Sequence, residues 1–350
     1  MPPKKNDKQK LGQFMTTNYK YILQNLFIPD DVKNIIEPFC GNGDLLNFIK
    51  DKDKDKDKYI IESYDIEPKK EFIIQRDTIK NPPDFTNKFL LTNPPYLARN
   101  KCDEKGLYDK YDVNDFYKCH MKELLKNSPV GGILIIPLNF WSSIRKNDII
   151  LRKEFLKKFD ILHLNIFEEQ VFSDTTYTVC SFQFQLKIDS IMKEININIY
   201  PCGKEIKTIL NEHNNFMIGG HIYNLKINGN YTINRITKNN KDDANTNILV
   251  KCIDDNEDNK IGLSIVDKKD VYVDNTPNLS ARTYASLIIN PVLNAGEQKK
   301  LVDKFNAYLN EEREKYHSLF LTNYRESKDI ARKRISFDLV YKICQYLLEN

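Results

Sequence analysis

Two Asn-Pro-Pro tripeptides begin twelve positions apart, at Asn81 and Asn93. The first runs into Asp84 and precedes an apolar stretch, whereas the second follows that stretch, Lys88–Leu91, and runs into Tyr96. Open α/β sheets place their active sites at the carboxyl ends of their strands. We therefore predict that Asn93 belongs to a site and that Asn81 belongs to an ordinary proline-stiffened turn.

The tetrapeptide from Asn93 to Tyr96 suits the activation of an exocyclic amine whose lone pair is delocalised into an aromatic ring. The Asn93 side-chain oxygen and the Pro94 carbonyl oxygen could accept hydrogen bonds from the two N–H bonds of the amine and so free its lone pair. Pro94 and Pro95 would hold these acceptors rigid before the substrate arrives. Tyr96 would offer a face to a planar base, which must flip out of a duplex to reach it.

A glycine turn follows an expected strand in the sequence NIIEPFCGNGDLL, residues 34–46. The strand ends at Glu37 and Pro38, and Gly41 and Gly43 let the backbone approach a ligand closely. Free N–H groups at the start of the next helix would face the same ligand. The turn lacks the third glycine of the dinucleotide fingerprint and the Gly-Lys-Ser/Thr of a phosphate-binding loop. A hydride-transferring enzyme and a nucleoside triphosphatase are therefore disfavoured, although such a turn is often only a turn.

Acidic residues follow the next expected strands. Asp65 comes directly after Tyr59–Tyr64 and stands about 20 residues past the glycine turn, where it could accept hydrogen bonds from ribose hydroxyls. The other reading of Asp65 is a solvated acid at a strand end, and Glu67 is a rival acid. Asp77 and Thr78 fall where a third strand-end loop would lie, and Asp77 could bond an adenine amino group.

The elements that must position these residues are short apolar runs alternating with helix-like segments, which predict a mostly parallel α/β sheet. Short runs without alternation suit strands that are covered on both faces. After about residue 190, β-like alternation and dense Asn and Lys predict a separate α+β domain that ends in two amphipathic helices. The expected strands are residues 32–36, 59–64, 88–91, 133–137, 161–167, 179–186, 194–200 and 231–236, and the helical stripes span 301–320 and 337–347.

Composition narrows the class of protein. The 350 residues are 41% hydrophobic and carry a net charge of +4, which allows one or two domains and does not by itself indicate nucleic acid. Seven scattered cysteines without a Cys-x-x-Cys pair and five unclustered histidines predict reduced thiols and no metal site. The chain shows neither a signal-peptide core nor an apolar run of bilayer length, so we expect a soluble, cytoplasmic protein with no membrane partner. The lysine excess in residues 1–20 is either a solvated end or an arm that touches phosphates.

Taken in order, these stretches resemble the amino-group DNA methyltransferases that use S-adenosylmethionine, in the N6-adenine branch with Asn-Pro-Pro-Tyr. The stretch Leu11–Thr17 is similar to the family segment that closes over the cofactor, through Phe14 and Thr16. QVFSDT resembles the later motif whose aromatic, here Phe172, sandwiches the flipped base against Tyr96. The implied cofactor-binding residues are Phe14, Thr16, Glu37, Pro38, Gly41, Gly43, Asp65, Ile66, Asp77 and Thr78, and the implied catalytic residues are Asn93, Pro94, Pro95, Tyr96 and Phe172.

The resemblance covers residues 11–186 well, in the gamma order of motifs, and implies a Rossmann-like methyltransferase domain with a mostly parallel seven-stranded sheet over residues 1–190. Residues 191–350 would form an α+β DNA target-recognition domain, similar but less specifically to relatives in restriction–modification systems and large DNA viruses. S-adenosylmethionine is the implied cofactor and double-stranded DNA the implied substrate, with room for a cognate restriction endonuclease acting as a separate protein. The candidates for contacts with DNA are Arg282, Arg332, Lys333 and Arg334.

Other classes share part of this motif set. Protein-glutamine and RNA N-methyltransferases carry the same tetrapeptide, but the glutamine enzymes resemble this chain less because their extra domain precedes the catalytic one. Cytosine-N4 methyltransferases more often have Ser or Asp in place of Asn93. A non-catalytic DNA-recognition subunit could lose Asn93 or Tyr96, and this chain has both. Covalent cytosine-C5 chemistry lacks its nucleophile, because no Pro-Cys pair ends the fourth expected strand.

Overall fold

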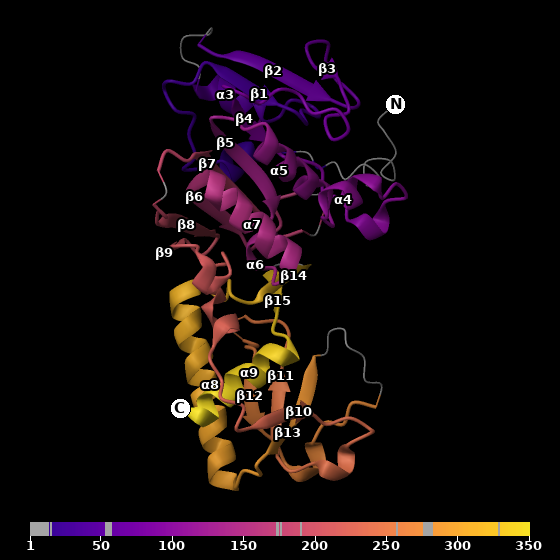
Figure 1. Ribbon diagram of the computed structural model, residues 1–350, viewed down its shortest axis with the longest axis vertical. Helices are drawn as coiled ribbons and strands as arrows, with labels where there is room; N and C mark the ends of the chain where they lie inside the picture. Colours follow the sequence, from indigo (N-terminus) through magenta and orange to yellow (C-terminus); the bar gives the residue numbers. More distant parts are fainter. Residues whose placement is uncertain are drawn as a thin grey trace. The chain divides into compact units, whose positions relative to one another are not determined.

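The chain folds into two compact units, which are drawn in Figure 1. The first comprises the chain through Asn211 together with Glu326–Ile330, and the second comprises Glu212–Arg325 and Ala331–Asn350. The structure is a computed structural model, and it describes residues 14, 16–52, 58–172, 175, 177–189, 191–256, 258–275, 283–327 and 330–350.

One large sheet forms the core of the first unit. Its strands are β1 (Asn34–Glu37), β2 (Ile60–Asp65), β3 (Ile74–Gln75), β4 (Phe89–Thr92), β5 (Gly131–Pro137), β6 (Phe159–Phe167), β7 (Val179–Leu186), β8 (Ile195–Tyr200) and β9 (Lys204–Thr208). Their order within the described residues is β3-β2-β1-β4-β5-β7-β6-β8-β9. Only β7 and β9 run against the others, so the sheet is mostly parallel as expected. The part β3-β2-β1-β4-β5 has the strand order of doubly wound nucleotide-binding sheets.

This sheet extends further along the chain than the sequence suggested. Nine strands take the place of the expected seven, because β8 pairs in parallel with β6 and β9 pairs with β8. The first unit therefore continues to Asn211, whereas the expected boundary at residue 190 falls between β7 and β8. Buried and more exposed side chains alternate along β8 because it lies near the edge of the sheet. Sequence alone does not distinguish this alternation from the first strand of a new domain.

Helices pack against this sheet, and Figure 1 shows α5 and α7 in front of the strands β5, β6 and β7. Strands β4 and β5 are buried along their whole length, as expected for central strands covered on both faces. The helical segments of this unit are α2 (Tyr19–Ile22), α3 (Leu46–Lys52), α4 (Gly106–Tyr111), α5 (Phe116–Lys126), α6 (Asn139–Ser142), α7 (Lys146–Lys158) and the 3-10 turn η1 (Arg99–Lys101).

Polar residues within buried strands hold the N-terminal segment in place. Asn165 on β6 donates to the carbonyl oxygen of Gln24 at 2.6 Å, and Ser181 on β7 donates to that of Ile22. Both side chains are fully buried, and burial of a polar group costs free energy unless it is hydrogen-bonded. The chain at residues 22–24 is therefore anchored to the sheet through specific hydrogen bonds.

The second unit combines an antiparallel sheet with helices. Its sheet, in the order β10-β13-β11-β12, is antiparallel, and its helices bury apolar residues that include Leu301, Phe305 and Ile343 against it. A capping box between Asn294 and Glu297 starts α8. The elements are β10 (Thr232–Arg235), β11 (Ile248–Lys251), β12 (Gly262–Ile265), β13 (Tyr284–Asn290), α8 (Ala295–Tyr316), α9 (Phe337–Glu349) and the 3-10 turns η2 (Glu212–Asn214), η3 (Gly220–Asn224), η4 (Lys241–Asp243) and η5 (Lys268–Asp270). The paired strands β14 (Thr322–Ser327) and β15 (Ile330–Arg334) are divided between the units, because Glu326–Ile330 belong to the first.

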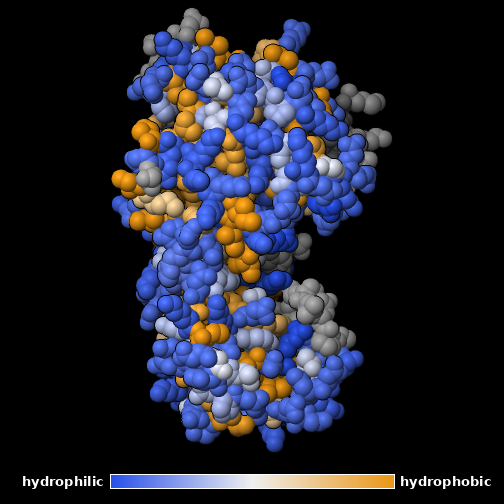
Figure 2. Space-filling model, viewed as in Figure 1, coloured by the Kyte–Doolittle hydropathy of each residue, from blue (hydrophilic) through white to orange (hydrophobic). Residues whose placement is uncertain are grey.

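Hydrophilic side chains predominate on the face shown in Figure 2, where hydrophobic ones form scattered patches. Among the helices that the structure describes, none is long and apolar enough to cross a membrane. The described residues also contain no group of three or more His, Cys, Asp or Glu side chains placed to hold a metal ion. All seven cysteines are free thiols.

Candidate functional site

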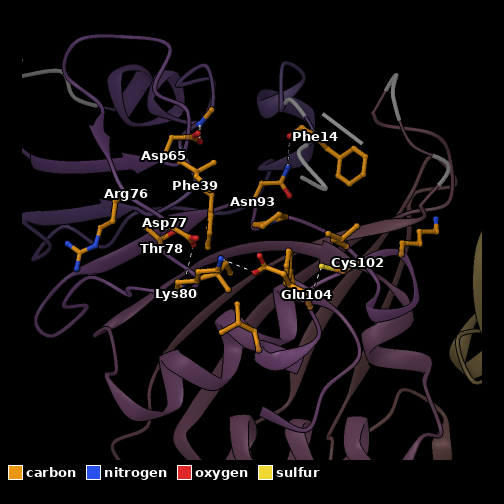
Figure 3. A pocket seen from close by; sticks show the side chains of 18 of the residues that line it. Phe14, Phe39, Asp65, Arg76, Asp77, Thr78, Lys80, Asn93, Cys102 and Glu104 are labelled. Atoms are coloured by element: carbon orange, nitrogen blue, oxygen red, sulfur yellow. Dashed lines mark hydrogen bonds and ion pairs between the residues drawn. The ribbon is translucent and has the colours of Figure 1, made fainter. Parts of the chain in front are cut away.

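A cavity of about 600 Å³ opens at the carboxyl ends of β1, β2 and β4 (Figure 3). Its wall includes Gly41 after β1, Asp65 at the end of β2 and Asn93 after β4. Ligand sites of open α/β sheets lie at this edge, and small-molecule pockets typically measure ~300–1,000 Å³. The predicted site residues that line this cavity are Phe14, Gly41, Asp65, Ile66, Asp77, Thr78, Asn93 and Pro95.

The glycine turn is clamped to the end of β2 by Asp65. Gly41 and Gly43 have φ angles of 52° and 76°, a region that side chains disfavour. The backbone N–H of Gly41 donates to Asp65 Oδ2 at 2.7 Å, and that of Glu67 donates to Oδ1 at 2.8 Å. Because a carboxylate oxygen has two lone pairs, Asp65 can still accept hydrogen bonds from a ligand in the cavity.

Glu37, at the end of β1, is a buried acid beside the glycine turn. Burial raises the pKa of its carboxyl well above the ordinary value, the Cys40 thiol opposes this by a hydrogen bond, and the charges of Asp44 and Asp65 raise the pKa further. Its Oε2 has no hydrogen-bond partner in the described part of the chain, although buried polar atoms almost always have one. The raised pKa favours the neutral form of Glu37, so the negative charge near the turn comes from Asp44 and Asp65.

The loop after β3 carries two more cavity residues and the first Asn-Pro-Pro tripeptide. The buried Thr78 hydroxyl donates to the carbonyl oxygen of Pro38 at 2.8 Å, while Asp77 accepts a backbone N–H of its own turn at 3.1 Å. Arg76 donates to the backbone oxygen of Asn81 at 2.8 Å and to its side-chain oxygen at 3.4 Å. Asn81 is exposed and its amide is engaged by Arg76, which fits the expected role as a turn residue.

The Asn93 amide has a defined direction. Its Nδ2 donates to the carbonyl oxygen of Phe14 at 3.1 Å and to the Thr16 hydroxyl at 3.0 Å (Figure 3 shows the first bond). A carbonyl oxygen can only accept, so the NH₂ group must face Phe14 and Oδ1 must point the other way. There Oδ1 lies within hydrogen-bond distance of the Tyr96 hydroxyl, which is also 2.8 Å from the carbonyl oxygen of Ile135.

Four aromatic rings gather next to Asn93. The Phe14 ring lies 5.2 Å from that of Tyr96 at an angle of 34°, and 6.3 Å from that of Phe172 at 25°. Tyr177, which the sequence analysis missed, presents its edge to both Phe14 and Tyr96. We expected Phe172 and Tyr96 to sandwich a base and Phe14 to contact the cofactor. In this structure Phe14 contacts both rings of the expected sandwich, so a base could enter only if the Phe14 side chain moved.

Asp115, another residue that the sequence analysis missed, is half-buried next to this cluster, with its Oδ1 shielded from solvent. An isolated bridge joins it to Ala98, and burial raises the pKa of its carboxyl to about 7 against the pull of Lys118 and of backbone N–H groups. Burial raises the pKa of the Tyr96 and Tyr177 hydroxyls, and the charge of the nearby Asp115 raises both pKa values further. No local pattern in the sequence marked Asp115, because its neighbours Ala98 and Tyr96 come from another part of the chain.

Asp115→Asn should raise the free energy of unfolding at about pH 8 and change it little at about pH 4.5. The pKa of Asp115 is raised from 3.8 to about 7 in the folded state, so the wild-type fold loses stability as the pH rises between these two values. Between those values the native state keeps a proton that the unfolded chain has released, whereas Asn has no proton to lose. The difference between the folded and unfolded pKa values corresponds to a gain in the free energy of unfolding of the variant on the order of a few kcal/mol at the higher pH. Urea unfolding at both pH values measures it, with Asp109→Asn on an exposed face as the control. An equal effect of Asp115→Asn at both pH values would contradict the prediction.

Several wall residues carried no signal in the sequence. Phe39 and Phe116 give the cavity apolar surface, and Lys80 pairs with Glu104 across it at 3.0 Å (Figure 3). Phe39 also packs its ring against the edge of His120, whose pKa burial lowers to about 3. These residues are brought together by the loops after β1, β3 and β4, which no local pattern places.

The predicted DNA contacts lie in the second unit, and the structure places three of the four. Arg332 forms a two-pronged pair with Asp254, with N–O distances of 2.8 and 3.0 Å, and Lys333 is buried. Arg334 is half-buried, and Arg282 lies outside the described residues. As they lie here, Arg332 and Lys333 belong to the packing of the second unit, because an ion pair and burial keep their charges from open solvent. A contact of these residues with DNA stays a prediction.

Comparison with known proteins gives only distant likenesses. No protein-family model and no curated protein matches the chain. Among solved structures, a protein described as a type I restriction-enzyme modification subunit from Vibrio vulnificus YJ016 is 14% identical, with a TM-score of 0.43 over 55% of this chain and 48% of that one. The type IIG restriction endonuclease BpuSI is 14% identical, with a TM-score of 0.42 over 69% of this chain and 37% of that one. A type I methyltransferase subunit from Streptococcus thermophilus is 14% identical, with a TM-score of 0.38 over 57% of this chain and 46% of that one. The chain spans less than half the length of each of these three, and at such scores the likeness carries no argument about function.

Proposed function

We propose that this chain is a DNA methyltransferase that uses S-adenosylmethionine to methylate N6 of an adenine flipped out of double-stranded DNA. One observation carries the proposal: a single cavity joins the glycine turn and Asp65 to Asn93 of the Asn-Pro-Pro-Tyr motif. A cofactor held at the first two would therefore lie beside the group that we expect to act on the amine. The sequence resemblance supports the same assignment.

The residues present fit the cofactor. Asp65 lies at the cavity wall with lone pairs for ribose hydroxyls, and Ile66 and Phe39 give apolar surface for an adenine. The charges of Asp44 and Asp65 near the glycine turn suit the cationic end of the molecule, and the orphaned Oε2 of Glu37 leaves a hydrogen-bonding atom there. S-adenosylmethionine, when bound, supplies an electrophilic methyl group on a sulfonium.

Asn93 would act on the target amine as a hydrogen-bond acceptor. The Tyr96 hydroxyl has one proton for two acceptors, Asn93 Oδ1 and the carbonyl oxygen of Ile135. Donation to Ile135 leaves Oδ1 open to one N–H of the amine, and the Pro94 carbonyl would accept the other. With both N–H bonds engaged by these acceptors, the lone pair of the amine nitrogen would be free for the methyl group that the sulfonium supplies, and the displaced proton would pass to water.

Methyl transfer from labelled S-adenosylmethionine tests the proposal, with duplex DNA, RNA and a release-factor protein as parallel substrates. We expect label in duplex DNA, and N6-methyladenine after digestion to nucleosides. N4-methylcytosine would keep the fold and the role of Asn93 but overturn the base. Label in RNA or protein alone would mean that the second unit, which we propose reads DNA, recognises something else. Cofactor binding without transfer would favour a recognition subunit.

A further inference from the structure

We propose that Thr16 is a positioning residue, which holds the Asn93 amide in the orientation that presents Oδ1 to the substrate. This inference rests on the proposed function and assigns Thr16 a task different from contact with the cofactor. The two residues stand 77 positions apart and meet through a 3.0 Å hydrogen bond from Asn93 Nδ2 to the Thr16 hydroxyl. The Thr16 side chain is buried, so water does not replace this acceptor easily.

Phe14 and Thr16 each accept a hydrogen bond from the Asn93 amide, and the two bonds have different effects. The carbonyl oxygen of Phe14, at 3.1 Å from Nδ2, can only accept and therefore excludes the flipped amide. The Phe14 oxygen accepts a hydrogen bond from one of the two N–H groups of the Asn93 amide. This single hydrogen bond would leave the amide free to rotate about it. The Thr16 hydroxyl takes the second N–H and fixes the plane of the amide.

The chemistry makes this orientation matter. A flipped Asn93 would aim two N–H donors at a target amine whose own N–H bonds need acceptors, and donors that face each other repel. An Asn93 amide that changes orientation also spends less time with Oδ1 placed to accept a hydrogen bond from the amine together with the Pro94 carbonyl oxygen. Because small misplacements of a positioned group can cost ~10²-fold in rate, the second hydrogen bond to Asn93 should affect kcat more than cofactor affinity.

The chain that follows Thr16 is tied to the sheet that carries Asn93. Asn165 and Ser181 bond the carbonyl oxygens of Gln24 and Ile22, and these two anchors restrain the chain a short distance along the sequence from Thr16. Thr17, by contrast, is exposed and offers a matched control.

The test compares Thr16→Val, Thr16→Ser and Thr17→Val in the full chain, with kcat for transfer to duplex DNA and Kd for S-adenosylmethionine measured separately. Thr16→Val keeps the shape of the side chain and loses the hydrogen-bond acceptor. We expect it to lower kcat roughly 10-fold, which corresponds to the loss of one hydrogen bond of ~1 kcal/mol or more. The Kd for S-adenosylmethionine should stay within about threefold of wild type. Thr16→Ser should recover most of kcat, and Thr17→Val should behave as wild type. Thr16→Ala replaces the valine variant if the latter does not fold.

Other outcomes would overturn the inference in distinguishable ways. A weakened Kd with unchanged kcat in Thr16→Val would make Thr16 a cofactor ligand and nothing more. Unchanged values of both would mean that the contact with Asn93 is not used. Failure of serine to recover kcat would point to packing rather than to the hydroxyl. A wild-type chain that transfers no methyl group to any substrate would overturn the proposed function, and this inference with it.

Discussion

Asn93→Ala should lower methyl transfer to background, a loss of at least roughly 10²–10³-fold in kcat, while the affinity for S-adenosylmethionine stays near that of wild type. The side chain supplies the acceptor that pulls on the target amine, and alanine leaves that N–H with no protein partner. Cofactor affinity should persist because, under the proposed function, the glycine turn and Asp65 would hold the cofactor from other strands. Single-turnover transfer to duplex DNA and calorimetric titration with the cofactor measure the two quantities.

The matched control for this substitution is Asn81→Ala, in the other Asn-Pro-Pro tripeptide. Asn81 is exposed and interacts with Arg76 in a turn, so its loss should leave kcat within about twofold of wild type and cost little stability. Near-full activity of Asn93→Ala would contradict the proposed mechanism. A large loss of activity in a folded Asn81→Ala variant would assign the chemistry to the wrong tripeptide.

Asp65→Ala should weaken the binding of S-adenosylmethionine roughly 10- to 100-fold, as expected for the loss of hydrogen bonds to a charged group of ~1.5–3 kcal/mol. Two effects add. Asp65 would no longer accept bonds from the ligand, and the N–H groups of Gly41 and Glu67 would lose the carboxylate that holds the glycine turn in place. Calorimetric titration gives the affinity, and thermal unfolding reports how far the turn itself is destabilised.

Glu67→Gln is the control for Asp65, because Glu67 is the rival acid two positions along. Its side chain is exposed and pairs with Lys69 at 3.3 Å, an arrangement typical of a solvated loop. Cofactor affinity in Glu67→Gln should stay within about twofold of wild type. If Glu67→Gln were the more damaging of the two, the ribose contact would belong to Glu67 and the assignment of Asp65 would fail.

Local patterns in the sequence were enough to find most strands of the first unit and several residues that line the cavity. The expected strand over residues 179–186 matches β7, and that over 88–91 lies one residue before β4. Asn93 and Asp65 were found because polar residues directly after an apolar run mark the carboxyl end of a strand, where parallel sheets gather their sites. The glycines at 41 and 43 could be found because their positive φ angles require a residue type that stands out in any sequence.

The sequence by itself thus determined the α/β class, the end of the sheet at which the site lies, and the residues that stand there, because each depends on the order of a few neighbouring side chains. Tertiary structure alone decided which distant residues complete the site. Three features join segments that lie far apart in the chain. They are the packing of the Phe14 ring against Tyr96 and Phe172, the hydrogen bonds from Asn93 to residues 14 and 16, and the position of Asp115 near Tyr96. Such contacts depend on how loops and strands pack, and a local pattern carries no information about that packing.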